Sequence, residues 1–434
     1  MDLDDLDKRK LDGKLGPAVQ HAMEHLVKMG EAFDAEKLVD VHSVHVFADY
    51  RTIGDGGLAF YEKLVDMGGS ISLPSSCEPI SLDLLNTKEF NWPAEYEKKQ
   101  LRINDALRTL GVNLSYSCTF YLTHNVAKRG ENLAWIEGNA TGFANSVIGA
   151  RGNREDSITS PLAGIAGRIP QYGLLDPANR VGECLIEIDP RVASLLGGPG
   201  MNSADFSALG MVIGDWAYDK IPVVTGLPRH LTNEQLKALM STCSPALTTT
   251  LLLLVGISPE APTVEAAFGG AIPRNVRRFR VELDDIRKAY DQLSNTRKED
   301  VDVVISGCPL KTIYEIQEVA RFLDGRRVKD GVKFYIHTDH STWSLAKESG
   351  LVDRITAAGA LLTRDTCEFC MPVETMYGPE TVIATDSMKM RRLVAGAGKP
   401  TWRFGSLVDC VNAAITGKFK STRWTLRSGE RAAA

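Results

Sequence analysis

Three cysteines of this chain stand where a metal site is expected. Cys118, Cys308 and Cys367 each follow a short apolar run that predicts a buried strand. In α/β proteins ligands bind at the carboxyl ends of strands, and thiolates are soft ligands preferred by iron-sulfur clusters and zinc. Buried, unligated thiols are the alternative. Cys370 forms a C-x-x-C pair with Cys367, which is also found in zinc and redox half-sites. Four other cysteines are expected to pack as small hydrophobic residues: Cys77, Cys184, Cys243 and Cys410.

A polar segment over residues 143–155, FANSVIGARGNRE, offers donors for an anion. Its small residues let a backbone approach a ligand closely, and its two arginines are fork-shaped donors for carboxylate or phosphate oxygens. A polar surface loop is the alternative interpretation. The polar side chains of the segment are Asn145, Ser146, Arg151, Asn153 and Arg154.

Acid-base groups are scattered along the chain, and the sequence does not pair them. Glu137, Asp339 and Lys389 are possible proton donors or acceptors. His337 and His340 end a predicted strand, where a histidine can ligate a metal, transfer protons or serve as a polar cap.

Residues 54–59, GDGGLA, fit the G-x-G-x-x-A pattern of a dinucleotide site between a predicted strand and a predicted helix. The strand ends several residues before Gly54, and no acidic residue ends a second strand about 20 residues later, which weakens this interpretation. Two others remain: a glycine turn before a helix, and a helix N-terminus whose N–H groups bind a substrate carboxylate or phosphate.

The elements that must position these residues alternate between strands and helices, which predicts an α/β fold with mostly parallel sheets. Glycine-rich and charged turns suggest three lobes over residues 1–196, 201–293 and 300–420, followed by a tail over 421–434. Helices are expected over 16–30, 57–67, 95–110, 310–323, 341–348 and 387–394, and extended segments over 39–47, 70–73, 301–305, 333–336 and 381–384.

The composition of the chain argues against several classes of function. The 434 residues carry 50 lysines and arginines against 55 aspartates and glutamates, so the chain lacks the basic field that nucleic-acid binding needs. The acidic start has no apolar core of a signal peptide, and the most apolar stretch, 246–257, is too short to cross a bilayer of about 30 Å. We therefore expect a cytoplasmic protein with reduced thiols and no membrane partner.

Several of these segments together resemble the large catalytic subunit of the aconitase X family. The resemblance extends from about residue 16 to residue 418, and it implies aconitase-like α/β/α lobes, an iron-sulfur cluster held by three cysteines and a hydro-lyase reaction. It rests on the 143–155 segment and on GIAGRIPQYG (164–173), IGDGGL (53–58), SCTFY (117–121), GCPL (307–310), DTC (365–367) and RFGS (403–406).

The resemblance also implies roles for single residues. The iron-sulfur ligands fall on Cys118, Cys308 and Cys367. Ser387 and Lys389 match a polar pair of the family that follows a late strand. Together with Glu137, which is proposed from its residue type alone, they are the candidate catalytic residues, and a group from another chain is the alternative. His45 matches a position next to the family's pocket, and its substrate loop is matched by Asn145, Ser146, Arg151, Asn153 and Arg154. Gly54 joins these candidate substrate-binding residues because of the helix N-terminus expected there.

The sequence departs from the family pattern where substrate is expected. Residues 75–78 read Ser-Ser-Cys-Glu where the family often has Thr-Thr-Leu-Asn, and Gly138-Asn139 replaces a double serine. Lys311 and Thr312 stand where archaeal members often carry a histidine-cysteine pair. A charged Glu78 would repel a phosphorylated ligand, which favours a hydroxyproline-like substrate.

We therefore expect a dehydratase that removes water from a small β-hydroxy carboxylate, with cis-3-hydroxy-L-proline favoured over mevalonate 5-phosphate. Iron would act as a Lewis acid while the arginines hold the carboxylate. An NAD-dependent oxidoreductase and a non-catalytic iron-sulfur subunit are the alternatives from other classes. Aconitase-like catalysis uses a swivelling domain of roughly 100 residues, for which the matched region leaves no room, so a small partner subunit is expected in a heteromer.

Overall fold

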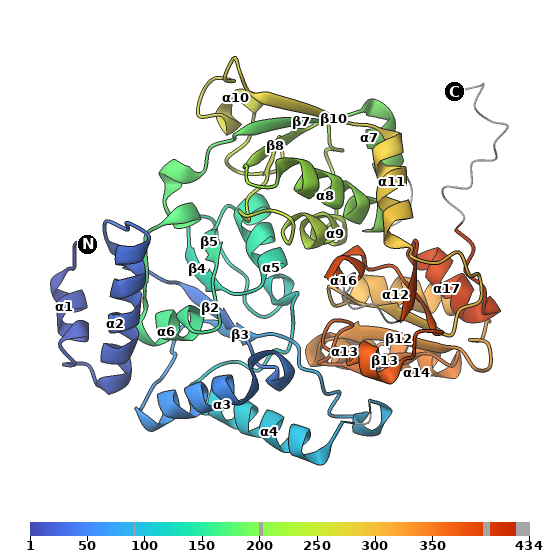
Figure 1. Cartoon of the computed structure of the whole chain (residues 1–434), viewed down its shortest axis with the longest axis horizontal. Coiled ribbons are helices and arrows are strands. Elements are labelled where there is room, and N and C mark those ends of the chain that lie inside the picture. Colours follow the sequence, from blue (N-terminus) through green and yellow to red (C-terminus); the bar gives the residue numbers. More distant parts are fainter. Residues whose placement is uncertain (91, 199–202, 394–399, 422–434) are drawn as a thin grey trace.

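The computed structural model describes residues 1–90, 92–198, 203–393 and 400–421, and within these ranges it forms three α/β lobes around parallel sheets. Figure 1 shows the first lobe in blue to teal, the second in green to yellow and the third in orange to red. Helices α5, α9 and α16 lie near the centre, where the lobes meet. No helix in the described ranges is long and apolar enough to cross a membrane. The expected tail lies outside them, apart from Ser421.

The first lobe has a four-stranded parallel sheet in the order β3-β2-β4-β5. Strands β2 and β3 are fully buried and β4 nearly so, whereas the edge strand β5 is partly exposed. The strands are β2 Ser43–Val46, β3 Ser75–Cys77, β4 Asn132–Trp135 and β5 Arg151–Arg154, with an antiparallel pair of β1 Leu38–Asp40 and β6 Arg168–Pro170. The helices are α1 Asp5–Leu11, α2 Pro17–Ala32, α3 Tyr50–Asp66, α4 Ala94–Thr109, α5 Gly138–Phe143 and α6 Thr159–Ala166, with the short turns η1 Thr87–Glu89, η2 Phe120–Leu122, η3 Ala144–Ile148, η4 Gly173–Leu175 and η5 Pro177–Asn179.

The second lobe has the parallel sheet order β10-β7-β8-β9. Its strands are β7 Cys184–Ile188, β8 Pro222–Thr225, β9 Leu253–Leu254 and β10 Arg277–Val281, and its helices are α7 Pro190–Leu196, α8 Ser203–Ala217, α9 Asn233–Cys243, α10 Val264–Ala267 and α11 Leu283–Leu293. The expected lobe boundary at residue 196 is therefore wrong. Strand β7 pairs with both β8 and β10, so the lobe begins before Cys184 and the glycine-rich turn falls inside it.

The third lobe has the parallel sheet order β13-β12-β11-β14-β15. Its strands are β11 Val303–Ser306, β12 Lys333–Thr338, β13 Leu361–Arg364, β14 Val382–Thr385 and β15 Thr401–Phe404. Its helices are α12 Ile313–Leu323, α13 His340–Glu348, α14 Leu351–Ala357, α15 Val373–Met376, α16 Met388–Leu393 and α17 Leu407–Thr416. The strand order reverses direction between β11 and β14, which makes a crevice at their carboxyl ends.

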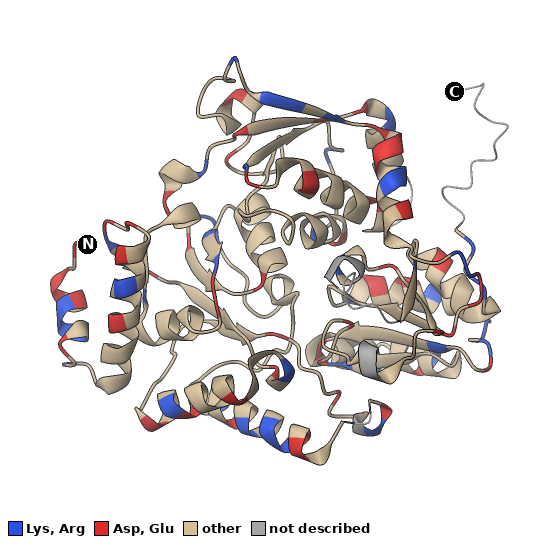
Figure 2. Cartoon of the chain, in the orientation of Figure 1, with Lys and Arg blue, Asp and Glu red and all other residues tan. Residues whose placement is uncertain are grey.

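Local sequence accounts for most of these elements. Capping boxes begin α9, α12 and α17, at Thr232, Thr312 and Ser406 respectively. Charges of both signs alternate along outer helices such as α1, α4 and α11 (Figure 2), which suits their solvent-facing sides. The extended segment expected over 70–73 forms no strand, and β3 lies slightly later, at Ser75–Cys77.

Candidate active site

Side chains that can bind metal or transfer protons meet at the junction of the first and third lobes, where the strand order of each sheet reverses. In the first lobe the order reverses between β2 and β4, which carry His45 and lead to Glu137. In the third lobe the reversal between β11 and β14 is followed by Cys308 and Ser387. Ligands of doubly wound sheets bind at such points, so both sheets contribute to one site.

The three expected metal ligands come together at this junction. Cys118, Cys367 and Cys370 pack in one buried cluster with Leu310, and the thiols of Cys308 and Cys367 are hydrogen-bonded to each other. The backbone N–H of Leu310 donates to Cys118 Sγ over 3.4 Å. The Sγ atoms of Cys367 and Cys370 are 3.6 Å apart, far beyond a disulfide bond, and none of the eight cysteines, all within the described ranges, forms a disulfide.

These thiols fit an iron-sulfur cluster by type and by burial. Within the described ranges, no three His, Cys, Asp or Glu side chains are arranged to hold a single ion. Cysteine ligands of a cluster bind different iron atoms and need not converge on one point. Burial raises the pKa of the Cys118 thiol, and its hydrogen bond to Cys367 raises that of Cys308. Both thiols are therefore protonated until a metal displaces the proton.

The loop that carries Cys308 is held from two lobes. Gly307 has φ 134°, and a Cβ there would lie 2.7 Å from the Cβ of His337, so only glycine fits. Lys237, on α9 of the second lobe, donates to the carbonyl of Leu310 over 2.9 Å and forms a buried ion pair with Glu315. This lysine therefore ties the second lobe to the cysteine loop.

The turn that carries Cys367 and Cys370 is held by the first lobe. The guanidinium of Arg51, on α3, donates to the carbonyls of residues 369, 370 and 371 at 3.2, 3.1 and 2.9 Å. Ser117, next to Cys118, donates to Asp339 Oδ2 over 3.0 Å and thereby joins the first lobe to α13. The positions of the thiols thus depend on how the lobes pack.

A buried ion pair lies beside the cysteines. Lys389 Nζ, on α16, is 2.6 Å from Glu137 Oε1, at the N-cap of α5, and the two side chains are 10% and 16% exposed. Burial by itself would raise the pKa of Glu137, but the Lys389 charge outweighs it and lowers that pKa. Burial opposes the charge of Lys389 too, yet Glu137 raises its pKa. Both groups are therefore charged at neutral pH.

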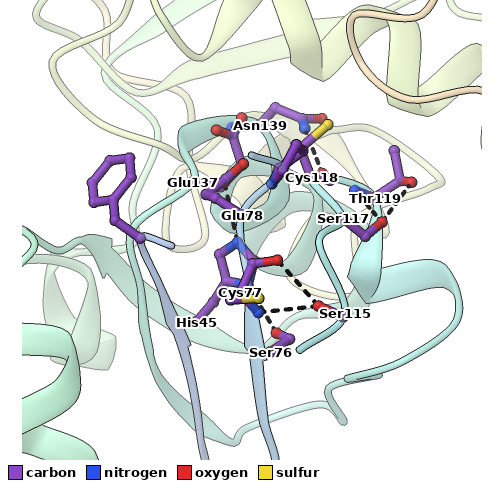
Figure 3. A network of polar contacts seen from close by, with 12 residues as sticks. His45, Ser76, Cys77, Glu78, Ser115, Ser117, Cys118, Thr119, Glu137 and Asn139 are labelled. Atoms are coloured by element: carbon purple, nitrogen blue, oxygen red, sulfur yellow. Dashed lines mark hydrogen bonds and ion pairs between the residues drawn. The ribbon is translucent and has the colours of Figure 1, made fainter. Parts of the chain in front are cut away.

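Glu78 lies between this ion pair and a buried histidine (Figure 3). Its Oε1 is 3.1 Å from His45 Nε2, and its carboxyl group is hydrogen-bonded to that of Glu137. Burial raises the pKa of Glu78 well above its usual value, and the negative charge of Glu137 adds to this. A raised pKa disfavours the charged form of Glu78, which weakens the expected repulsion between this residue and a phosphorylated substrate.

Ser387 lies at the crevice of the third lobe, but its hydroxyl is hydrogen-bonded to backbone groups. Its hydroxyl donates to the carbonyl of Cys308 and accepts from the N–H of Met390 over 3.0 Å. It therefore links the cysteine loop to the start of α16.

The polar segment 143–155 divides between two environments. Asn145 donates to the carbonyls of Gly152 and Thr250 at 2.8 and 2.9 Å and accepts from Gly152 and Arg180. Ser146 accepts from the N–H of Leu252 over 2.9 Å. These contacts join the first lobe to the second, and they use every hydrogen-bonding position of the Asn145 amide.

The two arginines of the segment lie at opposite ends of β5. Arg151 is opposite Asn132 at the start of the parallel pair, whereas Arg154 is opposite Trp135 at its carboxyl end. A Cβ on Gly138 would lie 3.2 Å from Arg154 Cδ, which places this arginine against the first turn of α5, next to Glu137. Arg154 thus lies at the end of β5 nearer the junction, and its Nη1 donates to the carbonyl of Ser244 in the second lobe over 3.4 Å. Asn153 pairs with the backbone, donating to Tyr172 and accepting from Leu174.

Gly54 lies at a kink between two helical segments that together make up α3, so a glycine turn before a helix is formed here, although a helical turn precedes it. Helix α3 starts at Tyr50, and Gly54 forms a kink inside it with φ 60°. The strand, glycine turn and helix of a dinucleotide fingerprint thus do not follow one another directly. Gly56 and Gly57 line a cavity of about 280 Å³ with Phe47, Phe60 and Tyr61.

Some residues of the site were missed or misjudged from the sequence. Cys370 shares the cysteine cluster, and Lys237 braces it. Lys237 could have been found from the sequence, because it lies within the buried helix α9 and a lysine is rarely buried unless an opposite charge pairs with it. The buried partners of Glu78 lie more than 30 residues away in sequence, so no local signal indicated its raised pKa.

Three domain models of one family match almost the whole chain. They are described as Aconitase X first domain, second domain and third domain, and they match residues 1–177, 182–291 and 301–416.

Proteins of known activity are similar over nearly the same length. The phosphomevalonate dehydratase large subunit of Methanothermobacter thermautotrophicus is 33% identical over 395 residues, which cover 91% of this chain and 94% of that protein. The cis-3-hydroxy-L-proline dehydratase of Pseudomonas aeruginosa is 31% identical over 418 residues, 96% of this chain and 70% of that protein. The crystal structure of Thermococcus kodakaraensis aconitase X in its holo-form has a TM-score of 0.82 and 27% identity, and covers 95% of this chain and 100% of that one.

Proposed function

The chain belongs to the aconitase X family, and we propose that it is the large subunit of a dehydratase that removes water from a small β-hydroxy carboxylate. The observation that carries this proposal is the meeting of four buried thiols with the Glu137–Lys389 ion pair at two strand-order reversals. The relatives named above are dehydratases of two hydroxy acids, which supports the same reaction class.

Cys118, Cys308 and Cys367 would hold an iron-sulfur cluster. When bound, the cluster would supply an iron atom as a Lewis acid for the substrate hydroxyl. The chain's own free thiols also suit a reducing, cytoplasmic location.

Glu137 is the proton acceptor that the site favours. It is ionised, whereas Lys389 is protonated and the hydroxyl of Ser387 is donated to Cys308. Glu137 would take the proton from the carbon next to the substrate carboxylate. Lys389 would keep Glu137 charged and stabilise negative charge that develops on the substrate.

Arg154 would bind the substrate carboxylate. It lies against the first turn of α5 beside Glu137, and a guanidinium binds a carboxylate through two parallel hydrogen bonds. The bound carboxylate would then hold the adjacent C–H bond near the proton acceptor.

A small subunit would complete the enzyme. The M. thermautotrophicus relative is called a large subunit, and this chain covers 94% of it. A second chain that closes over the junction would exclude water from the ionised groups.

The test is anaerobic reconstitution of the chain with iron and sulfide, with and without the small subunit. We expect a visible absorption band from the chain alone and turnover of cis-3-hydroxy-L-proline or mevalonate 5-phosphate when both chains are present. The raised pKa of Glu78 disfavours a negative charge there, so a phosphorylated substrate is not excluded and both substrates are assayed. Bound iron without turnover of either would contradict the proposal.

A further inference from the structure

Cys367 and Cys370 form a close pair of thiols, and only Cys367 has a part in the proposed function. Their Sγ atoms are 3.6 Å apart, and both residues are buried. Cys370 Sγ also lies 3.6 Å from the carbonyl oxygen of Pro79, which is a weak contact because a thiol is a poor donor. Oxidation of Cys370 would therefore cost the fold little.

The backbone between the two cysteines already has the shape that a disulfide needs. The N–H of Met371 donates to the carbonyl of Cys367 over 3.0 Å, which closes one helical turn. Residues three apart in such a turn lie on the same face, with Cα atoms about 5 Å apart. Disulfides join residues whose Cα atoms are about 4.4 to 6.8 Å apart. The two sulfurs can therefore bond by rotation of their side chains, without movement of the backbone.

Arg51 of the first lobe holds this turn in place. Its guanidinium donates to the carbonyls of Phe369, Cys370 and Met371. Groups that are positioned in advance react as if one were highly concentrated around the other. The turn nevertheless lies at the surface, because Phe369, between the two cysteines, is 47% exposed. The pair is thus both prearranged and close to solvent.

The other cysteines at the junction are less suited to such a bond. Cys118, Cys308 and Cys367 lie in three different loops, each held by hydrogen bonds from another lobe. A disulfide between any two of them would have to pull two separately held loops together. The pair within one turn is therefore the one that oxidation favours.

We propose that Cys367 and Cys370 are a redox site, which a small-molecule disulfide converts to a reversible protein disulfide when no cluster is bound. One protein thiolate attacks a sulfur of the small disulfide, whose S–S bond breaks and releases one small thiolate. The second protein thiolate attacks this mixed disulfide, forms the Cys367–Cys370 bond and releases the other small thiolate. The two protein protons go to the two small thiolates. The chain is thus oxidised by two electrons, and the small disulfide is reduced to two thiols.

The disulfide and an iron-sulfur cluster would compete for Cys367, and this part of the inference rests on the proposed function. The oxidised chain lacks one of the three proposed ligands, whereas a bound cluster leaves Cys370 without its partner. By linkage, each state disfavours the other by the same factor. Oxidation would therefore keep the empty site from taking up metal until the chain is reduced.

The test uses the full-length chain without a cluster, in buffers of reduced and oxidised glutathione. Trypsin cleaves after Arg364 and Lys389, so both cysteines fall in one peptide, over residues 365–389. This peptide should lose the mass of two hydrogen atoms, and dithiothreitol should restore it. The folded chain should hold the disulfide at a ratio of reduced to oxidised glutathione about tenfold or more above that of the urea-unfolded chain.

Two variants and two contrary results define this test. Cys184→Ser, in β7 of the second lobe, should behave as the wild type, whereas Cys370→Ser should show no such loss of mass. A peptide that stays reduced in fully oxidised glutathione would overturn the proposal, as would equal ratios in the folded and unfolded chains. So would a cross-link of Cys367 to Cys308, which would join two different tryptic peptides.

Loading the chain with iron and sulfide tests the competition separately. At the glutathione ratio that oxidises half of the empty chain, the iron-loaded chain should keep the pair reduced. If the loaded chain forms the disulfide and keeps its iron, Cys367 is not a ligand, and the proposed cluster site is overturned while the redox site stands. If iron binds but the empty chain forms no disulfide, the redox site is overturned while the proposed function stands.

Discussion

The ammonium nitrogen of Lys389 lies 2.6 Å from Glu137 Oε1 and joins helix α16 of the third lobe to the N-cap of helix α5 in the first. The two residues are 252 positions apart in sequence. An ion pair this buried keeps both partners charged and also fixes how the two lobes meet. It is therefore both a stabilising contact and the centre of the proposed chemistry.

Replacement of Lys389 by an uncharged residue separates its effect on stability from its effect on catalysis. In Lys389→Met, Glu137 is left buried without its cation, so its pKa should rise and kcat should fall by about 10²-fold or more. The free energy of unfolding should drop by about 3–5 kcal/mol, as when one partner of a buried pair is lost. Adding Glu137→Gln should restore stability but not activity, measured by urea unfolding and steady-state kinetics. Recovery of turnover in the double variant would contradict the assignment of Glu137.

The cysteine ligands can be distinguished from the other buried cysteines. Cys118→Ser, Cys308→Ser and Cys367→Ser should each lose most of the bound iron and the visible absorption, because serine is a poor ligand for soft metal sites. Cys370→Ser should keep most of the iron, although its sulfur is 3.6 Å from that of Cys367. Cys184→Ser, in β7 of the second lobe, is the control for loss of a buried thiol. Full iron content in Cys308→Ser would show that the ligand set is wrong.

Lys237 should stabilise the junction between the second and third lobes. Lys237→Met removes the buried pair with Glu315 and the hydrogen bond to Leu310, so we expect a loss of about 3–5 kcal/mol in the free energy of unfolding. Iron loading should weaken as well, because Leu310 lies in the cysteine loop. Lys220→Met, at a half-exposed ion pair with Glu183, should change stability by less than about 1 kcal/mol. Equal effects of the two substitutions would argue against an interlobe role.

Glu155 should make stability depend on pH. Burial raises its pKa from 4.5 to about 8, so the folded chain binds a proton that the unfolded chain releases. This stabilisation is present below about pH 4.5 and is lost as pH rises towards 8, with a total of about 5 kcal/mol. Glu155→Gln should therefore be more stable than the wild type at pH 8–9 and similar at pH 5. Parallel unfolding curves for the two proteins across this range would contradict the prediction.

The two arginines of the polar segment should differ in their effect on activity. Arg154→Lys keeps the charge but loses the bidentate fork, so kcat/KM should fall about tenfold or more. Arg151→Lys should leave kinetics nearly unchanged, because Arg151 lies at the opposite end of β5 from Glu137. Steady-state kinetics on both variants compare them directly. An equal loss in both would mean that the whole segment acts on the substrate.

The alternation of helices and strands, and the residues that follow the strands, could be predicted from the sequence alone. Alternating strand and helix patterns predicted the α/β class, and the parallel sheets confirm it. Cys308 and Cys367 could be placed after buried strands because apolar runs and the residues that follow them are neighbours in sequence. The lobe boundary at residue 196 failed for the opposite reason, since a glycine-rich turn looks the same between lobes as within one.

Which side chains contact one another in the candidate site is known only from the tertiary structure. The sequence predicted that Asn145 binds a ligand, but its amide is occupied by partners that include Thr250 of the second lobe. It also predicted a charged Glu78, whereas burial beside Glu137 raises the pKa of this carboxyl group. The Glu137–Lys389 pair joins two lobes and follows from no local pattern. Charge state and hydrogen-bond partner depend on which distant residues pack against a group, and packing between lobes is not encoded in the spacing of neighbouring residues.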